Sequence, residues 1–449
     1  MNSKSVVVIG AGPGGEAAAK RAAELGAQVT IIERAEVGGL CLNAGCIPSK
    51  MLLEGGRLLR QVRSAAYLVG GSTASIHWDM LQEKKRGLVT HFRKSLEQRF
   101  GQLKIRLVRG DARFVSPHSV RVTGPEGAQN IDFETAVIAT GSAPFFPPPF
   151  DPSVQDILDS DRVLNLTQVP KSLVVVGGGA VGLEFACLFH ELGTAVTVVE
   201  KMPQLLPGEE ASVSRFLQQS FEKRGIKVHT EQTVTSAEKS SDGWRITLSK
   251  GEECFAERVL VCVGRRASLN DLGLELAGVS VERGRIAVND FMQTSRASIY
   301  AVGDVNGLSL LAHAAAVQGS VAVGHMMGKG TSYAHARVPR CLYTWPEVAS
   351  VGEWTHSASI KDLEVKTQRF FFQGSAKALA AEEGEGFIQI LSNKKDGRLL
   401  GAQIIGPHAT ELIHILSVAL AAGQTVDQLR QVIFAHPTLS EGIPGALGR

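Results

Sequence analysis

The chain has 449 residues, 44% of them hydrophobic, so it can bury a sizeable interior and is long enough for roughly two to four domains. Its 47 lysines and arginines against 44 aspartates and glutamates leave a net charge of only +3, which does not indicate a nucleic-acid partner. No stretch approaches the roughly 18 apolar residues of a membrane helix, and no secretory signal is evident, so we expect a cytoplasmic protein without a membrane partner.

The first predicted elements are a strand, a glycine turn and a helix. Residues 5–9 (SVVVI) predict a buried parallel strand, followed by Gly10-x-Gly12-x-x-Gly15, an alanine-rich helix and a second strand that ends at Glu33. The first glycine allows the tight turn, the second lets backbone N–H groups approach a pyrophosphate, and the third lets helix and strand pack closely. The acid would accept hydrogen bonds from a ribose diol.

The same pattern returns later in the chain. Residues 173–176 begin another strand, followed by Gly177-x-Gly179-x-x-Gly182, a helix and a strand that leads to Glu200. In both copies the acid lies 23 residues after the first glycine. A lone motif of this kind also occurs in ordinary turns, and a lone acid is often a solvated strand end, but the paired spacing favours dinucleotide binding in both copies.

Two such folds predict two dinucleotide cofactors, one tightly held and one exchanging, as in a flavoprotein that exchanges hydride with NAD. A carboxylate at Glu200 would repel a 2′-phosphate and favour NAD(H) over NADP(H), although Lys201 tempers that preference. Strands followed by glycine recur at 136–142, 259–266 and 298–305. In the last of them Asp304 could bind the ribityl hydroxyls of a flavin, or could instead be a helix N-cap.

A glycine-flanked stretch at 38–50 (GGLCLNAGCIPSK) places Cys41 and Cys46 five residues apart. On a regular helix such residues lie roughly 8–9 Å apart, beyond the usual disulfide range of about 4.4–6.8 Å. A bridge would need a distorted turn, which Gly45 could supply, and a strained bridge suits a redox-active pair. The rival interpretation, a zinc site, lacks a second Cys/His cluster.

Four other cysteines are scattered among apolar neighbours, and we expect them to be buried and inert: Cys187, Cys254, Cys262 and Cys341.

At this point the chain resembles the pyridine nucleotide-disulfide oxidoreductases of the glutathione reductase group, and CLNAGCIPSK is most similar to the dihydrolipoamide dehydrogenase branch. The resemblance covers nearly the whole chain, because ATGS, GGGAVGLEFA, VGRR, YAVGDV, LLAHAA, YTWPEVASVG and HPTLSE follow in the order of the family. It implies an α/β fold with two Rossmann-like domains, one for FAD and one for NAD, and a C-terminal α+β dimerisation domain.

The resemblance also implies roles for the central residues. Cys46 would be the thiolate that faces the flavin, and Cys41 would exchange with the dithiol substrate. Lys50 would lie near the flavin and pair with Glu184 of the second fingerprint helix, where a cation stabilises negative charge on the reduced flavin and on nearby thiols.

Near the C-terminus, HPTLSE would carry His436 and Glu441. In the family this histidine reaches the active site of the other subunit of a homodimer as the acid–base group, and the glutamate orients it. From the sequence alone, a histidine before proline is equally consistent with a turn residue.

Further cofactor contacts, mostly through the backbone, are implied by similarity alone. For FAD they are Gly14, Ala112, Thr140, Gly141, Ser142, Leu311, Ala312 and His313, and for NAD they are Val234 and Gly264. No metal site is expected.

The family plan divides the chain into four parts: an FAD domain at 1–143, an NAD domain at 144–270, a central segment at 271–338 that completes the FAD domain, and an interface domain at 339–449. Within the last part, FIQILS and LLGAQIIG predict strands and 409–422 predicts an apolar helix, whose face fits either a dimer interface or ordinary core packing.

The leading functional hypothesis is dihydrolipoamide + NAD⁺ = lipoamide + NADH + H⁺, with electrons passing from the dithiol to the Cys41–Cys46 disulfide, then to FAD and to NAD⁺. Its partner would be a lipoyl-bearing protein of a 2-oxoacid dehydrogenase complex or of the glycine cleavage system. A reductase of another disulfide, of the glutathione type, is the nearest alternative. A mercuric reductase would need a C-terminal cysteine pair, but the last cysteine of the sequence is Cys341. A non-catalytic NADH-binding regulatory flavoprotein is the alternative from another class.

Overall fold

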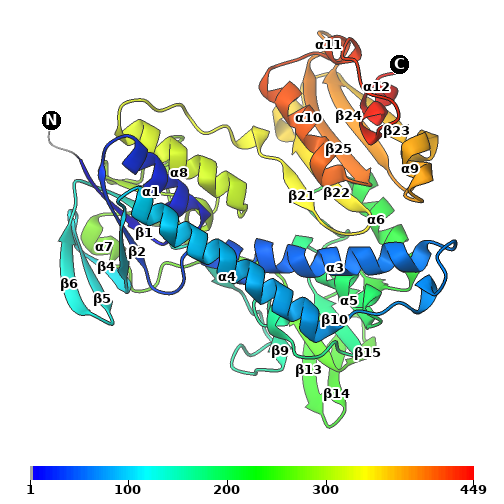
Figure 1. Cartoon of the computed structure of the whole chain (residues 1–449), viewed down its shortest axis with the longest axis horizontal. Coiled ribbons are helices and arrows are strands. Elements are labelled where there is room, and N and C mark those ends of the chain that lie inside the picture. The colour runs from blue at the N-terminus through cyan, green and yellow to red at the C-terminus, as the bar shows by residue number, and fades with distance from the viewer. Residues whose placement is uncertain (1–3, 449) are drawn as a thin grey trace. The chain divides into compact units, whose positions relative to one another are not determined.

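The computed structural model describes residues 4–448, which form two compact units (Figure 1). The first unit contains residues up to Met51, Gln82–Phe145 and Arg265–His335. The second contains Leu52–Leu81, Phe146–Gly264 and Ala336 onward. The finer division into four domains, which we expected from the family plan, stays a prediction.

A five-stranded parallel sheet forms the centre of the first unit. Its strands, in spatial order, are β20 (Ile299–Ala301), β7 (Thr135–Ile138), β1 (Ser5–Ile9), β2 (Gln28–Glu33) and β3 (Arg106–Arg109). Side chains alternate between the two faces of a strand, so a sheet that is covered on both faces needs continuous apolar runs. In β1, Val6 and Val8 join the core on one face, and Val7 and Ile9 join the core on the other.

Helices cover one face of this sheet, and a small sheet contributes to the core on the other. Helices α1 (Pro13–Glu24) and α8 (Ala312–Met326) pack side by side (Figure 1). The second cover is the antiparallel sheet of β4 (Asp111–Ser116), β5 (Ser119–Gly124) and β6 (Gly127–Asp132). The short helix α2 (Gly39–Ala44) follows β2, and helices α3 (Cys46–Ser64) and α4 (Trp78–Gln102) cross from one unit to the other along the chain.

The second unit repeats the parallel design. Its first sheet has the order β12 (Lys227–His229), β11 (Ala195–Val199), β10 (Ser172–Val176), β16 (Arg258–Val261) and β9 (Ile157–Leu158), all parallel. Helix α5 (Ala180–Glu191) follows β10, and α6 (Ala211–Arg224) leads to β12. An antiparallel sheet of β13 (Val234–Ser240), β14 (Gly243–Leu248) and β15 (Glu253–Ala256) packs its apolar face into the same core.

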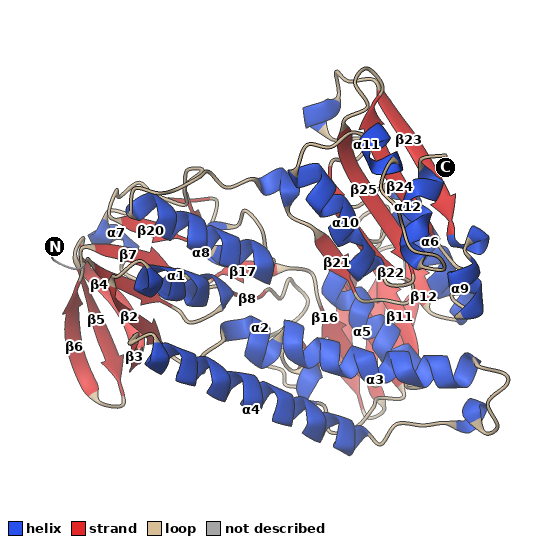
Figure 2. Ribbon diagram, turned by 45° about the horizontal axis from the view of Figure 1, so that its top comes forward, coloured by secondary structure: helices blue, strands red, loops and turns tan. Residues whose placement is uncertain are grey.

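The last part of the second unit is an antiparallel sheet with helices. Its strands are β21 (Arg340–Leu342), β22 (Glu347–Gly352), β25 (Leu399–Gly406), β24 (Phe387–Asn393) and β23 (Val365–Phe371), in that order. Helix α10 (Ala409–Ala421) lies across β22 and β25 (Figure 2), and the short helices α11 (Val426–Arg430) and α12 (Gly442–Ala446) complete the core.

These elements confirm the strands and helices that the sequence predicts in both nucleotide folds and in the last sheet. The expectation for the minor cysteines is wrong for three of the four. Cys187 is buried, but Cys254, Cys262 and Cys341 are partly exposed. An apolar sequence neighbourhood does not fix burial, because alternate residues of a strand face opposite sides.

Candidate active site

The first glycine turn is shaped by two close approaches. Gly10 has φ +101°, and a Cβ there would lie 2.3 Å from the Ala139 carbonyl oxygen. A Cβ on Gly15 would lie 1.9 Å from the Gly10 carbonyl oxygen, so α1 can pack against the turn only without a side chain at this position. Gly14 instead lies against α8, where a Cβ would meet Ala315, so its lack of a side chain serves the packing of the two helices.

The second turn has the same geometry. Gly177 has φ +112°, and a Cβ there would lie 2.4 Å from the Cys262 carbonyl oxygen. A Cβ on Gly182 would lie 2.2 Å from the Gly177 carbonyl oxygen. The two turns therefore impose the same constraints on different stretches of chain.

Both acids at the ends of the second strands are buried and bound by backbone amides. Glu33 accepts hydrogen bonds from Ala11 N at 2.7 Å and from Ala35 N at 2.9 Å. Glu200 accepts from Gly178 N at 2.5 Å and from Met202 N at 2.7 Å. With 8% and 7% exposure, the two acids are not solvated strand ends.

The turns fit dinucleotides, because each leaves one glycine open. A Cβ on Gly12 would meet nothing closer than 3.8 Å, and one on Gly179 would meet nothing within 4 Å. Both glycines cap the N-terminus of a fingerprint helix without a side-chain cap, and helix N-termini attract phosphate. The backbone at these positions can accept a pyrophosphate, with the acid at the adjacent strand end for a ribose.

Asp304, for which a flavin contact stays a prediction, belongs to a hydrogen-bonded group. Ser142 donates to the Asp304 carboxylate at 2.5 Å, and Arg265 donates to the hydroxyl and the carbonyl oxygen of Ser142, both at 2.9 Å. Asp304 lies within a 3-10 turn that begins at Gly303 and is capped by Val302, so Asp304 is not the N-cap of that turn. Thr140 donates to the Ser268 carbonyl oxygen at 2.8 Å.

The two cysteines of the pair lie on different helices. Cys41 is in α2, and Cys46 is the first residue of α3. Between them Gly45 has φ −143° and ψ −117°, outside the helical region, and a Cβ there would lie 2.9 Å from the Leu40 carbonyl oxygen. The sequence argument required such an interruption for a bridge, and the structure provides it.

The two sulfurs of the pair lie in different electrostatic environments. No disulfide joins Cys41 and Cys46 in this structure. The side-chain hydrogen bond to Cys46, together with burial and the negative charge of Cys46, raises the pKa of the Cys41 thiol above its ordinary range. Because Cys46 begins the 19-residue helix α3, the helix dipole also favours negative charge there.

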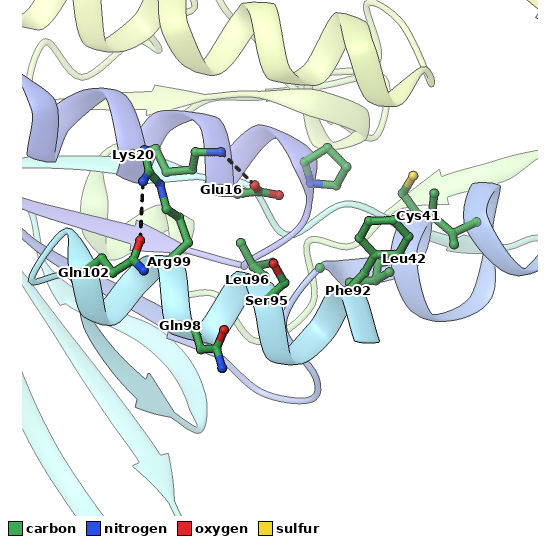
Figure 3. A pocket seen from close by; sticks show the side chains of 13 residues that line it. Glu16, Lys20, Cys41, Leu42, Phe92, Ser95, Leu96, Gln98, Arg99 and Gln102 are labelled. Carbon is green, nitrogen blue, oxygen red and sulfur yellow. Dashed lines mark hydrogen bonds and ion pairs between the residues drawn. The ribbon is translucent and has the colours of Figure 1, made fainter. Parts of the chain in front are cut away.

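A cavity of about 490 Å³ opens beside Cys41, between α1 and α4 (Figure 3). Cys41 lies at one end of it, next to Leu42 and Phe92, and the other end carries Lys20 and Arg99 (Figure 3). The cavity thus combines an apolar end at the Cys41 thiol with a polar end, as is typical of small-ligand sites.

The predicted pair of Lys50 and Glu184 is divided between the two compact units, so the pairing stays a prediction. Lys50 follows Cys46 on α3, in the first unit. Glu184 is buried in α5, where its Oε1 accepts from Tyr343 N at 3.0 Å.

The structure brings His436 and Glu441 together. The His436 Nδ1 lies 3.0 Å from the Glu441 Oε1, and Thr438 N donates to the other carboxylate oxygen at 2.8 Å. The Thr438 amide and then His436 hold the pKa of the Glu441 carboxyl below its usual range, so the acid stays charged beside the imidazole. The side chain of His436 is 77% exposed, which leaves its other ring nitrogen accessible.

The remaining similarity-based contacts lie at ends or edges of elements. Gly141 and Gly264 have positive φ, Ala112 lies in β4, Val234 begins β13, and Leu311, Ala312 and His313 form the N-terminus of α8. Their roles stay predictions.

The sequence analysis missed two groups of residues. The α4 side of the cavity, with Phe92 and Arg99, carries no motif, and only the tertiary packing of α4 against α1 reveals it. Arg265 belongs to the VGRR stretch, which was noted for its glycine alone.

The fold and the site together define a class of protein. The family model of the pyridine nucleotide-disulphide oxidoreductases matches residues 4–319, and the model of the dimerisation domain of that family matches residues 338–447. The chain therefore belongs to the pyridine nucleotide-disulphide oxidoreductase family.

Particular relatives narrow the comparison. The chain is 40% identical to a dihydrolipoyl dehydrogenase of Thermus scotoductus, over 99% of this chain and 96% of the relative, and 38% identical to one of Geobacillus stearothermophilus, over 97% and 93%. Among solved structures it is similar to LpdA of Mycobacterium tuberculosis (TM-score 0.93, 28% identity, 99% and 98% covered). It is also similar to the HOCl-induced flavoprotein disulfide reductase RclA of Escherichia coli (TM-score 0.89, 25% identity, 99% of each chain covered).

Within residues 4–448 no helix is both long and apolar enough to cross a bilayer. Over the same residues, no cluster of three or more histidine, cysteine or acidic side chains could hold a metal ion.

Proposed function

We propose that the protein is an FAD-containing, NAD-dependent dihydrolipoyl dehydrogenase, which catalyses dihydrolipoamide + NAD⁺ = lipoamide + NADH + H⁺. The observation that carries the proposal is the thiol pair of Cys41 in α2 and Cys46 at the start of α3, with Cys41 open to a cavity, in a chain with two dinucleotide folds. The relatives named dihydrolipoyl dehydrogenase, which match along nearly the whole chain, support it.

Residues at each fold would hold a different cofactor. FAD would lie on the first turn, with Glu33 and Asp304 as its acidic contacts, and NAD would lie on the second turn, with Glu200 at the ribose. When bound, FAD supplies the redox centre between the thiol pair and the pyridine nucleotide. The carboxylate of Glu200 favours NAD over NADP, since it would repel a 2′-phosphate.

The thiol pair would perform the exchange with the substrate. In the oxidised pair, a substrate thiolate attacks the Cys41 sulfur and releases Cys46 as a thiolate. The second substrate thiol then attacks the substrate sulfur of the mixed disulfide and closes the substrate disulfide. Cys41 leaves as a thiolate and takes up the proton of that second thiol. The raised pKa of the Cys41 thiol agrees with this division, because the charge of the reduced pair then lies on Cys46.

His436 and Glu441 would move the substrate proton. The carboxylate fixes the imidazole through Nδ1, so the other ring nitrogen can accept the proton of the dithiol. In the homodimer that the family plan implies, this pair would complete the active site of the other subunit. The exposure of His436 and of Ile433, at 89%, supports a partner surface over this segment.

The apolar end of the cavity suits the short aliphatic chain of a lipoyl group, and a lipoyl-bearing protein of a 2-oxoacid dehydrogenase complex or of the glycine cleavage system would present it. A reductase of another disulfide is the second candidate. The similarity to RclA, which is named a flavoprotein disulfide reductase, favours this alternative.

The test is the initial rate of NAD⁺ reduction by dihydrolipoamide with the purified holoprotein, compared with NADPH oxidation by glutathione disulfide. We expect turnover only in the first reaction, its loss in Cys46→Ser, and a decrease of about 10²-fold or more in His436→Gln. Turnover of glutathione disulfide without turnover of dihydrolipoamide would establish the second candidate instead.

A further inference from the structure

In the second unit, one face of α5 is covered by the chain between β21 and β22. Glu184, Cys187 and Glu191 lie three and four residues apart, and therefore on one face of the helix. The covering segment runs from Tyr343 to Trp345. The family resemblance implies a role for Glu184 alone, so Cys187 and Glu191 need a separate explanation.

The segment binds this face of α5 through its backbone amides. Tyr343 N donates to the Glu184 carboxylate at 3.0 Å, and Trp345 N donates to the Cys187 sulfur at 3.3 Å. Cys187 is fully buried and Trp345 is 5% exposed, so solvent does not compete for these bonds. Burial raises the pKa of the Cys187 thiol, which therefore stays neutral beside the amide.

Arg224, the last residue of α6, fixes the same segment from the side. Its Nη2 donates to the Trp345 carbonyl oxygen, and its Nη1 lies 3.3 Å from a carboxylate oxygen of Glu191. Both Nη atoms lie 3.9 Å from the Cys187 sulfur. The side chain is 17% exposed and its guanidinium lies over the Phe221 ring, so the side chain has little freedom to move. Both the amide and the carbonyl of Trp345 are thus fixed to the helix.

The indole of Trp345 reaches α3. A Cβ on Gly56 of that helix would lie 2.8 Å from the Trp345 Cη2 and 3.0 Å from the Leu188 Cδ1, so α3 and α5 meet around this ring. Lys50 lies six residues earlier on α3, about 9 Å along the helix axis. The segment that positions Glu184 therefore also contacts the helix that carries Cys46 and Lys50.

We propose that Arg224 and Cys187 are positioning residues that act through Glu184: they fix the Tyr343–Trp345 backbone on α5, and this backbone fixes the Glu184 carboxylate. The inference rests on the proposed function and on the role that the family resemblance implies for Glu184, which is to pair with Lys50. A carboxylate that accepts a hydrogen bond from a fixed amide is restricted in its orientation, and charge-assisted hydrogen bonds of this kind are strong.

The first test is hydrogen–deuterium exchange of the Tyr343 and Trp345 amides in the holoprotein. In Arg224→Gln and Cys187→Ala we expect exchange at Tyr343 to accelerate about tenfold or more, because the segment opens more often. Cys187→Ser retains an acceptor for the Trp345 amide and should exchange like the parent. Arg63→Gln is the matched control, since Arg63 donates to the Glu191 carbonyl oxygen at 2.8 Å and to Ala74, and not to the segment.

The second test is a double-mutant cycle with Glu184→Gln, measured as the rate of NAD⁺ reduction by dihydrolipoamide. If Arg224 acts through Glu184, Arg224→Gln lowers kcat about tenfold in the parent and less than about twofold in the Glu184→Gln background. Equal losses in both backgrounds, or unchanged exchange at Tyr343, would overturn the inference. If Arg224→Gln does not fold, the comparison of Cys187→Ala with Cys187→Ser decides the question.

The two tests separate this inference from the proposed function. A parent protein without dihydrolipoamide turnover would reject the proposed function, and with it the role of Glu184 that the inference needs. A parent with turnover whose variants exchange normally would reject only the positioning by Arg224 and Cys187.

Discussion

The two nucleotide folds have the same backbone and different surroundings. From the first strand to the acid, each residue of the second fold lies 167 positions after its counterpart, as Gly177 does after Gly10 and Glu200 after Glu33. The turns share the positive φ, the close approaches and the two amide bonds to the acid. The helices after the turns differ: α1 leaves several residues at least partly exposed, whereas α5 is continuously buried from Gly182 to Phe189.

This difference shows what the glycine motif does and does not determine. The positions of Glu184 and Cys187 in α5 correspond to Ala17 and Lys20 in α1. In α1 this face is partly exposed, and Lys20 lies at the cavity beside the thiol pair. In α5 it is buried under another segment and holds a carboxylate. The motif fixes where the helix starts, and the elements packed against the helix decide what its faces do.

The largest expected effect sharpens this contrast in burial. Leu188→Ala should lower the free energy of unfolding of the second unit by about 2–5 kcal/mol, because it removes a fully buried side chain. Its counterpart, Arg21→Ala on the exposed face of α1, should change stability by less than about 0.5 kcal/mol. Tryptophan fluorescence during urea unfolding reports on the second unit, since all 4 tryptophans lie there. Circular dichroism measures the unfolding of the Arg21→Ala variant, whose substitution lies in the first unit. Similar losses in both variants would break the contrast.

The next effect separates packing from binding within one turn. Gly182→Ala forces a methyl group against the Gly177 carbonyl oxygen and should cost about 1–3 kcal/mol of stability. Gly179→Ala should leave stability unchanged, since nothing lies within 4 Å of the added Cβ, and should instead weaken NAD⁺ binding about tenfold or more. Thermal unfolding and a calorimetric titration with NAD⁺ check the two halves. Normal NAD⁺ affinity in Gly179→Ala would contradict the open-turn assignment.

A third pair tests whether the two acids serve different cofactors. Glu200→Gln should raise the KM for NAD⁺ about tenfold and reduce the preference over NADP⁺, because one amide bond and the repulsive charge are lost. Glu33→Gln should instead reduce the FAD content of the purified protein and leave the KM of the loaded fraction unchanged. Absorbance spectra and steady-state kinetics measure both. The same phenotype in both variants would contradict the division of cofactors.

The smallest effect concerns the exposed side of α1. Lys20 and Glu16 form an ion pair of 3.2 Å, one helical turn apart and partly exposed. Lys20→Ala should therefore cost only about 0.2–0.5 kcal/mol, and less at high salt. Urea unfolding at two salt concentrations, followed by circular dichroism, checks this value. A loss above about 1 kcal/mol would mean that this face of α1 is packed as tightly as its counterpart on α5.

Much of the fold could be predicted from local patterns. The structure confirms the strand, helix and second strand that we predicted in each nucleotide fold. These predictions used the apolar runs of β1 and β10, the glycine spacing and the acids at 33 and 200. The interruption of the helix at Gly45 could also be predicted, because a regular helix would hold the two cysteines too far apart for a disulfide. Burial of the minor cysteines was predicted incorrectly for three of four, because it depends on which face of a strand another element covers.

The sequence by itself determined the two nucleotide turns, the thiol pair and the family, because each depends on residue types at short and fixed spacing. Only the tertiary structure decided which residues line the cavity beside Cys41 and that Ser142 joins Asp304 to Arg265. It also decided that Arg224 and Cys187 bind the backbone of the Tyr343–Trp345 segment. The physical reason is that these contacts join residues from distant parts of the chain, and such contacts form only when the elements pack. Local spacing records the backbone requirements of a turn or a helix, but it does not record which faces meet.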